Sequence, residues 1–225
     1  AISITEHDKL DPFIESYFKK TELNVIKGCE FTTNLGAHII GLFINNATPE
    51  NNDIYTIIKY IISQNGLILV PHPYKETSGV LKVYEEYSFL ENCHLIEIVN
   101  GGIKETKKEI NELISYAKKY DLKMVSGSDS HKVDQIGYYV NYYKDSSEDL
   151  YNTIKKQDPI IYFDSSFKSA PRKIYNFQKM HIYQVLLKLL SPKIRRWIKL
   201  YFNIIFKSQV NIKKPIYKKL DLKHE

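Results

Sequence analysis

The amino-acid sequence predicts an α/β fold, a mainly parallel sheet that is open or closed into a barrel and covered by helices. Three observations support this class. Short apolar runs alternate along the chain with amphipathic stretches, as strands and helices do in a parallel sheet. Asn65-Gly66 and Asn100-Gly101-Gly102 supply turn residues between them. With 225 residues, 43% of them hydrophobic, the chain is long enough for one substantial domain and an appendage.

The strands are predicted from apolar runs of four to nine residues, a length typical of strands. In chain order they are residues 1–5, 24–31, 36–44, 67–71, 94–99, 123–127 and 160–163.

The helices are predicted from amphipathic stretches between these runs. They are residues 51–66, 80–90, 105–121 and 146–157. Within 105–121, apolar residues recur at i, i+3, i+4 and i+7, which places them on one helix face; they are Ile110, Leu113, Ile114 and Ala117. Farther on, residues 179–209 read as two helices, the second beginning at Ser191-Pro192.

Charge divides the chain into two parts. Residues 168–225 contain 15 Lys and Arg against two acidic residues, a net charge of +13, while residues 1–167 carry −7. We therefore expect an acidic domain at residues 1–167 and a basic helical extension at 168–225. Basic blocks of this kind contact nucleic acid, an anionic membrane surface or another subunit, or remain a solvated appendage.

Cysteine content and hydropathy indicate the compartment. Cys29 and Cys93 form neither a disulfide framework nor a CxxC zinc motif, and they fit a reducing compartment. No run of about 18 uncharged apolar residues predicts a membrane-spanning helix. We expect a cytoplasmic protein.

Polar side chains follow five of the predicted strands, where active sites of parallel α/β folds gather. They are Glu6-His7-Asp8, Glu30, His72, Asn100 and Asp129-Ser130-His131. Asp129 and His131 are two residues apart and would project to the same side of a strand. Imidazoles and carboxylates without thiolates suit Mn, Zn or Fe. This pattern favours a metal site over a set of polar strand caps.

Six motifs, in this order, resemble the PHP family, named for its polymerase and histidinol-phosphatase members. They are "TEHD" (5–8), "GCEFTT" (28–33), "GAHIIGLFI" (36–44), "PHPY" (71–74), "IEIVNG" (96–101) and "GSDSH" (127–131). The resemblance covers roughly residues 1–140. It implies a distorted seven-stranded (β/α) barrel of TIM-like type that holds two or three divalent metal ions and usually hydrolyses phosphoesters. The chain looks most similar to the small stand-alone phosphoesterases, some of which act on nucleoside phosphates or on RNA 5′ ends.

The resemblance also assigns roles to residues. It places five at metal-ligand positions: His7, Glu30, His72, Asp129 and His131. Of these, it makes Glu30, His72 and Asp129 catalytic, with Glu30 the candidate that bridges two ions. His38 is expected to contact the substrate or the metal shell, with core packing as the alternative, and Asn100 to bind substrate or form a turn. Asp8 would orient His7 or begin a loop.

One motif of the family has no counterpart. No HxH pair occurs in the chain, although the family carries one at the end of its first strand. We expect the chain to begin inside the domain, without the first strand; natural loss of the first metal position is the alternative. In either case these residues alone are expected to bind fewer ions and to hydrolyse phosphoesters poorly.

Two functions follow from these expectations. The first is metal-dependent hydrolysis of a phosphorylated metabolite, a nucleotide or a nucleic-acid 5′ end, in which paired metal ions acidify a bridging water. The second is a non-catalytic PHP-like module that binds a phosphorylated ligand, nucleic acid or a protein partner.

Overall fold

The structure of the protein is a computed structural model that describes residues 1–19, 21, 23–132, 135–144, 149–165 and 215–221. The chain forms two compact units. One contains Ala1–Phe163 with Lys218–Glu225, and the other is Asp164–Tyr217. The helices predicted at 179–209 lie outside the described residues. Of the extension predicted to be helical at 168–225, residues 215–221 are described, and they contain a strand at Tyr217–Lys219.

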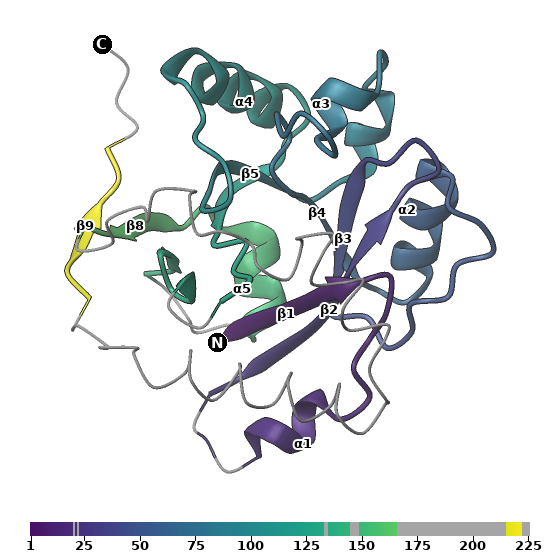
Figure 1. Ribbon diagram of the computed structural model, residues 1–225, viewed down its shortest axis with the longest axis horizontal. Helices are drawn as coiled ribbons and strands as arrows, with labels where there is room; N and C mark the ends of the chain where they lie inside the picture. The colour runs from purple at the N-terminus through teal and green to yellow at the C-terminus, as the bar shows by residue number, and fades with distance from the viewer. Residues whose placement is uncertain (20, 22, 133–134, 145–148, 166–214, 222–225) are drawn as a thin grey trace, which may run out of the picture. The chain divides into compact units, whose positions relative to one another are not determined.

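A curled six-stranded sheet forms the body of the first unit (Figure 1). Its strands, in spatial order, are β1 (Ile2–His7), β2 (Val25–Thr32), β3 (His38–Leu42), β4 (Leu67–Val70), β5 (Leu95–Asn100) and β6 (Lys123–Gly127). The first six predicted strands are thereby confirmed. Within the described residues they make a curled half-barrel, whereas the resemblance implied a distorted seven-stranded barrel whose first strand was expected to be missing from this chain.

Strand β3 departs from the mainly parallel arrangement that the sequence predicted. The pairs β1–β2, β4–β5 and β5–β6 are parallel, but β3 runs antiparallel to both β2 and β4. Only residues 33–37 separate β2 from β3. A parallel pair needs a crossover of about a dozen residues or more, so this short turn forces the antiparallel pairing.

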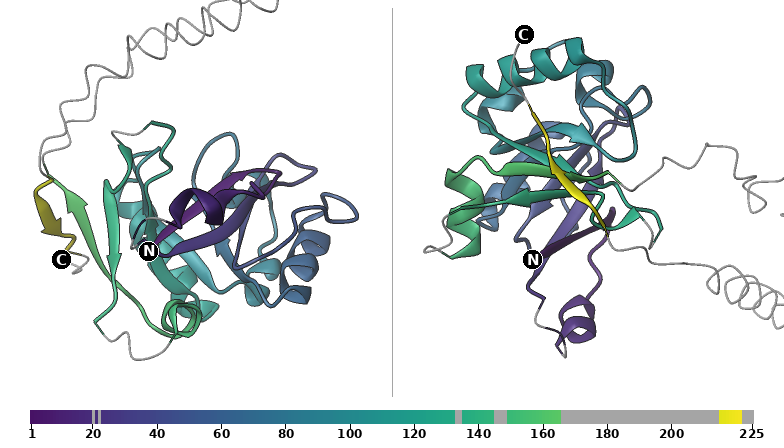
Figure 2. Two further views of the ribbon diagram at one scale, coloured as in Figure 1. Left: turned by 90° about the horizontal axis from the view of Figure 1, so that it is seen from below. Right: turned by 90° about the vertical axis from the view of Figure 1, so that its left-hand side faces the viewer.

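A second sheet has three strands in the order β7-β8-β9, which lie side by side in Figure 2. They are β7 (Tyr139–Tyr142), β8 (Ile160–Asp164) and β9 (Tyr217–Lys219). Strand β8 was predicted, whereas β7 and β9 were not. The backbone N–H of Leu220 donates to Ile161 O at 2.8 Å.

The helices are α1 (Ile14–Phe18), α2 (Ile54–Ser63), α3 (Val80–Val83), α4 (Lys107–Lys119) and α5 (Leu150–Lys156), with a 3-10 helix at Ser88–Asn92. Asp53 caps α2, and Thr106 with Glu109 forms a capping box on α4. A single helix over 80–90 was wrong, because Tyr84 is extended and ends α3 after one turn. The short α1 was not predicted.

The two faces of the six-stranded sheet bury separate apolar layers. One face packs against α2 and α4 through residues such as Ile57, Leu113 and Phe31. The other packs Ile26, Ile40, Leu42, Leu67, Leu69, Leu95 and Val125 against Ile154 of α5. Below we call this second face, defined by these residues, the inner face.

Two further sequence predictions concern the described residues. Cys29 and Cys93 are both free and buried. Among the described residues, none of the helices has the length and apolar character that crossing a bilayer requires.

Candidate metal centre

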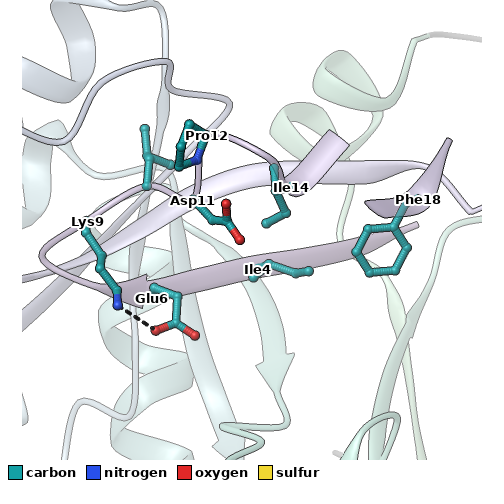
Figure 3. A pocket seen from close by; sticks show the side chains of 8 residues that line it. Ile4, Glu6, Lys9, Asp11, Pro12, Ile14 and Phe18 are labelled. Atoms are coloured by element: carbon teal, nitrogen blue, oxygen red, sulfur yellow. Dashed lines mark ion pairs between the residues drawn. The ribbon is translucent and has the colours of Figure 1, made fainter. Parts of the chain in front are cut away.

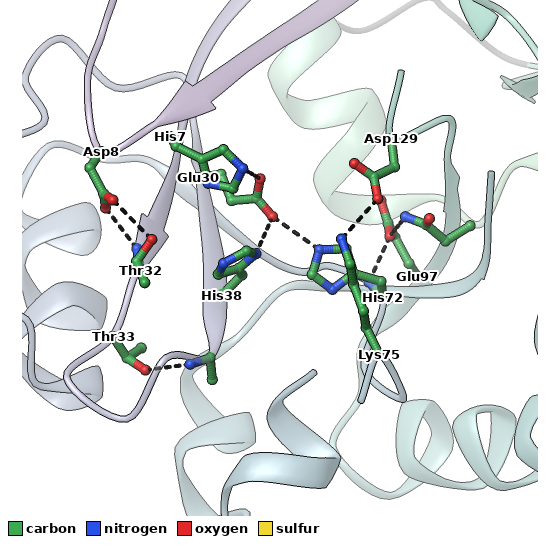
Figure 4. Close-up of polar contacts among 12 residues, drawn as sticks. His7, Asp8, Glu30, Thr32, Thr33, His38, His72, Lys75, Glu97 and Asp129 are labelled. Carbon is green, nitrogen blue, oxygen red and sulfur yellow. Dashed lines mark hydrogen bonds and ion pairs between the residues drawn. The ribbon is translucent and has the colours of Figure 1, made fainter. Parts of the chain in front are cut away.

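Strand alternation brings polar side chains to one end of the inner face. Successive side chains of a strand point to opposite faces, so Glu30 shares the face of Ile26 on β2, and His38 shares that of Ile40 on β3. Glu97 likewise follows Leu95 on β5. The apolar layer thus ends in two carboxylates and an imidazole (Figure 4).

The antiparallel direction of β3 explains why His38 joins this group. Its first residue lies at the edge where β2 ends, with Thr32 opposite His38 and Glu30 opposite Ile40. Site residues were expected at the ends of strands, whereas His38 is the first residue of β3. Only the resemblance of residues 36–44 to a motif of the family indicated that His38 belongs to the site.

Glu30 is the centre of the cluster. Its Oε2 lies 3.4 Å from His7 Nε2, and its Oε1 lies 2.9 Å from His38 Nδ1 and 3.1 Å from His72 Nε2. Ligand atoms of His7, Glu30 and His38 all lie within 4.8 Å of one another, and in the described part of the chain no other such trio occurs. Three imidazoles, from β1, β3 and the loop after β4, thus surround one carboxylate of β2.

The electrostatics keep Glu30 ionised. Burial by itself would raise the pKa of Glu30, but hydrogen bonds and charge from His38 and His72 outweigh it and hold that pKa well below its usual range. The His7 side chain is 51% exposed, so the cluster is open to solvent on that side.

His72 is held in a strained backbone conformation. It has φ of +28°, a region that non-glycine residues rarely adopt. Its backbone N–H donates to Glu97 Oε2 at 2.8 Å, and its buried Nδ1 has no hydrogen-bond partner among the residues that the structure describes. The imidazole therefore has Nε2 directed at Glu30 and a second nitrogen uncommitted.

Glu97 is a site residue that the sequence analysis missed. Glu97 lies inside the predicted strand 94–99 and not after it, so its only sequence signal was that a charged residue interrupts the apolar run. Burial raises the pKa of Glu97 to about 7, although hydrogen bonds from His72 N–H and the Asn100 amide oppose the shift. Gly127 on β6 leaves room for this carboxylate, because a Cβ there would lie 1.8 Å from Glu97 Oε1.

Asn100 makes contacts within the protein through both ends of its amide. Its Nδ2 donates to Glu97 Oε2 at 2.7 Å, and its Oδ1 accepts from Gly102 N–H at 2.7 Å. It is buried. The structure thus gives Asn100 a part in shaping the turn, and its contact with substrate stays a prediction.

Asp129 and His131 form a second polar group, outside the trio around Glu30. Asp129, with φ of +45°, pairs with Lys75 Nζ at 3.2 Å through Oδ2. His131 Nδ1 lies 2.9 Å from the backbone oxygen of Asp129, and its side chain is 68% exposed. Their roles as metal ligands stay predictions.

Asp8 contacts Thr32 and not the His7 ring. Its carboxylate accepts from Thr32 N at 2.7 Å and from Thr32 Oγ1 at 2.9 Å. It fastens the loop after β1 to the end of β2. Support of the His7 tautomer by Asp8 stays a prediction.

A separate hollow of about 450 Å³ lies beside β1 and α1 (Figure 3). Apolar side chains and the Lys9–Glu6 ion pair line it. The cluster around Glu30 contributes none of its lining residues, which are Ile4, Glu6, Lys9, Leu10, Asp11, Pro12, Ile14 and Phe18.

The cluster fits a divalent metal ion by its donor chemistry. One carboxylate and neutral imidazole nitrogens are the ligands that Mn, Zn and Fe accept. His7, Glu30 and His38 would hold the ion, and His72 adjoins them through Glu30.

Comparisons with known proteins show which family and which relatives this chain resembles. Residues 111–159 match the PHP-associated family, which confirms the resemblance inferred from the motifs. Two uncharacterised proteins of Methanocaldococcus jannaschii are 35% and 36% identical over 131 and 104 residues, or 56% and 44% of this chain. The matched regions are 54% and 57% of those proteins, so the chain spans about half the length of the curated relatives.

Solved structures are also similar. A two-domain protein of Bacteroides vulgatus containing a predicted PHP-like metal-dependent phosphoesterase is 21% identical, with a TM-score of 0.48. The similarity covers 72% of this chain and 48% of that protein.

Proposed function

We propose that this protein hydrolyses phosphoesters with divalent metal ions bound around Glu30. One observation carries the proposal: four chain segments bring His7, His38 and His72 against a single buried carboxylate. The match to the PHP-associated family supports it. Phosphorylated metabolites, nucleotides and nucleic-acid 5′ ends are the substrate classes that fit.

The side chains of this site hold and orient charge. Glu30 stays anionic because its imidazole neighbours lower its pKa, so it is ready to bind a cation without losing a proton. A divalent ion bound there supplies polarisation of phosphoryl oxygens and acidification of a bound water. His72 and Asp129, which follow β4 and β6, both have positive φ, a backbone conformation that persists only where the surrounding structure imposes it.

The site is open to solvent on one side, where a substrate could enter. The exposed His7 edge admits solvent and substrate, whereas His72 and Glu97 lie at the buried end.

The alternative is a module that binds a phosphorylated ligand, nucleic acid or a protein partner without catalysis. The number of side chains favours it: the trio with His72 gives four ligands, whereas two or three ions require about four partners each. A module of this kind would bind one ion and inorganic phosphate but release no product.

Hydrolysis of p-nitrophenyl phosphate and of bis-p-nitrophenyl phosphate, with Mn²⁺ or with EDTA, tests the proposal. We expect Mn²⁺-dependent release of nitrophenol that Glu30→Gln abolishes. The exposed Glu85 provides the control, and Glu85→Gln should retain full rate. Metal binding without any turnover would contradict the proposal and support the binding module.

A further inference from the structure

Lys75 places a positive charge inside the site. Its Nζ lies 3.2 Å from Asp129 Oδ2, and the two side chains are 29% and 12% exposed. Figure 4 shows the Lys75 chain rising beside His72 toward Asp129. An ion pair that is largely removed from water is stronger than one on the surface.

The backbone of Lys75 is fixed relative to His72. Lys75 N–H donates to His72 O at 2.9 Å, and Gly79 N–H donates to Lys75 O at 2.7 Å. Only glycine fits at position 79, since a Cβ there would lie 2.3 Å from Pro73 O and 2.6 Å from Lys75 N. The turn therefore ties the backbone of Lys75 to that of His72, next to the cluster around Glu30.

The charge balance of the site leaves a place for this ammonium. Glu30, Glu97 and Asp129 are carboxylates gathered around the same strand ends, and a phosphate ester adds further negative charge. When a cation binds Asp129, the attraction between Asp129 and Lys75 weakens, and the ammonium becomes free to pair with another anion. Lysine is a strong point-charge donor to phosphate.

We propose that Lys75 binds the phosphoryl oxygens of the substrate, with Asp129 holding it in place while no substrate is bound. This inference rests on the proposed function, because it names the side chain that recognises the phosphoryl group at that site. In the alternative role, Lys75 only neutralises the charge of Asp129 and does not contact the substrate. The two differ in what Lys75 contributes once the site contains both metal and phosphate.

Lys75→Gln and Lys75→Arg, with Lys82→Gln as the matched control, separate these roles. Lys82 belongs to the same segment, is similarly exposed at 32%, and pairs with Glu76 at 2.8 Å. Three quantities are measured in each variant: the inhibition constant of inorganic phosphate, kcat and KM for p-nitrophenyl phosphate, and Mn²⁺ affinity by calorimetry.

We expect Lys75→Gln to raise both the inhibition constant of phosphate and KM by about 10-fold or more, the effect of losing one charge-assisted hydrogen bond. Lys75→Arg should restore most of the affinity, and Lys82→Gln should match the wild type. Mn²⁺ affinity of Lys75→Gln should be equal or higher, because a competing cation has gone. An unchanged phosphate constant in Lys75→Gln would overturn the inference.

Failure of the proposed function is distinguishable from failure of this inference. Wild-type protein that binds Mn²⁺ but turns over no ester contradicts hydrolysis. Calorimetry of phosphate with the Mn²⁺-loaded protein then decides the role of Lys75: weaker binding by Lys75→Gln alone supports it, and equal binding by wild type and Lys75→Gln overturns it.

Discussion

Glu30 combines burial with a low pKa because hydrogen bonds and charge from His38 and His72 outweigh the effect of burial, and His7 lies near its other oxygen. Burying the anionic Glu30 carboxylate costs free energy unless a nearby positive charge compensates it. A divalent cation supplies that charge, whereas a purely structural cluster would need protonated histidines. The residues around Glu30 are thus better suited to binding a metal than to stabilising the fold.

The first prediction at this scale concerns His38. Because a ligand atom of His38 lies within 4.8 Å of ligand atoms of His7 and Glu30, His38→Gln should weaken Mn²⁺ binding. The loss should exceed the roughly 10- to 100-fold effect of removing a residue that only supports a ligand. Calorimetric titration of Mn²⁺ measures it.

His94 provides the control for this experiment. Its Nδ1 accepts from Ile68 N–H at 3.1 Å, a structural contact far from ligand chemistry. His94→Gln should leave Mn²⁺ affinity unchanged. A His38 variant with wild-type metal affinity but a higher KM would return His38 to the substrate role predicted from the sequence.

The second prediction concerns Glu97 and pH. Burial raises its pKa to about 7 from 4.5, so between these values an unfolded chain loses a proton that the folded chain retains. The stability contribution is complete below pH 4.5 and is lost as pH rises through 7. Glu97→Gln should reduce the loss of stability between pH 5 and pH 8 by about 2–3 kcal/mol.

Urea unfolding of the metal-free protein in EDTA at both pH values measures this difference. Glu85→Gln, which removes an exposed carboxylate, should follow the wild type. Glu105 also has its pKa raised to about 7 by burial, so part of the pH dependence should persist in Glu97→Gln. Identical pH dependence in Glu97→Gln and wild type would show that Glu97 ionises normally in the folded protein.

At the scale of elements, the outer edge of β6 is completed by side chains. The Asn141 amide accepts from Ser126 N–H at 2.9 Å and donates to Ser126 O at 2.8 Å, as a neighbouring strand would. Asp158 Oδ1 accepts from Met124 N–H at 2.8 Å. These contacts satisfy backbone groups on the strand that leads to Asp129.

Asn141→Ala should therefore lower the free energy of unfolding by about 1–3 kcal/mol, because the Ser126 N–H loses its partner. Hydrogen exchange should accelerate at the Ser126 amide. Val140→Ala, at a more exposed position of the same strand, is the control and should not change that amide. Unaltered exchange of Ser126 in Asn141→Ala would mean that the edge is held by other contacts.

Sequence patterns located the strands that contain apolar runs and missed β7 and β9, which contain none. Leu67–Val70 is an unbroken apolar run because both of its faces are covered. Strand β7 alternates half-buried and exposed residues in Tyr139–Tyr142, and no apolar run marks it. The apolar pattern also did not predict the direction of β3, because the short turn before it, and not its composition, makes it antiparallel to its neighbours.

The site could be predicted in the same uneven way. Glu30 and His72 follow apolar runs and lie at the cluster, as their positions predicted. Glu97 lies within a run, where a charged residue carries no signal of a tertiary partner. His131 is directed to solvent at a loop, which depends on the backbone after Asp129 and not on spacing along the chain.

At the scale of the whole molecule, charge is unevenly distributed between the acidic residues 1–167 and the basic residues 168–225. An acidic body repels nucleic acid and phosphorylated metabolites at long range, whereas a basic segment attracts them. Among the partners considered for the extension, nucleic acid is the one that a phosphoesterase site can also use as a substrate.

The last prediction concerns that attraction. The extension concentrates four basic residues in one short stretch, Lys193, Arg195, Arg196 and Lys199. Changing all four to glutamine should weaken binding of a 5′-phosphorylated single-stranded RNA. Each lost phosphate contact should reduce the slope of log K against log salt by about 0.7.

A control with the same change in net charge replaces four exposed lysines of the acidic body by glutamine: Lys104, Lys107, Lys108 and Lys118. Fluorescence titrations at several salt concentrations compare the two variants. Equal affinities and slopes would assign any RNA binding to net charge alone, and a specific loss in the extension variant would identify this stretch as the contact.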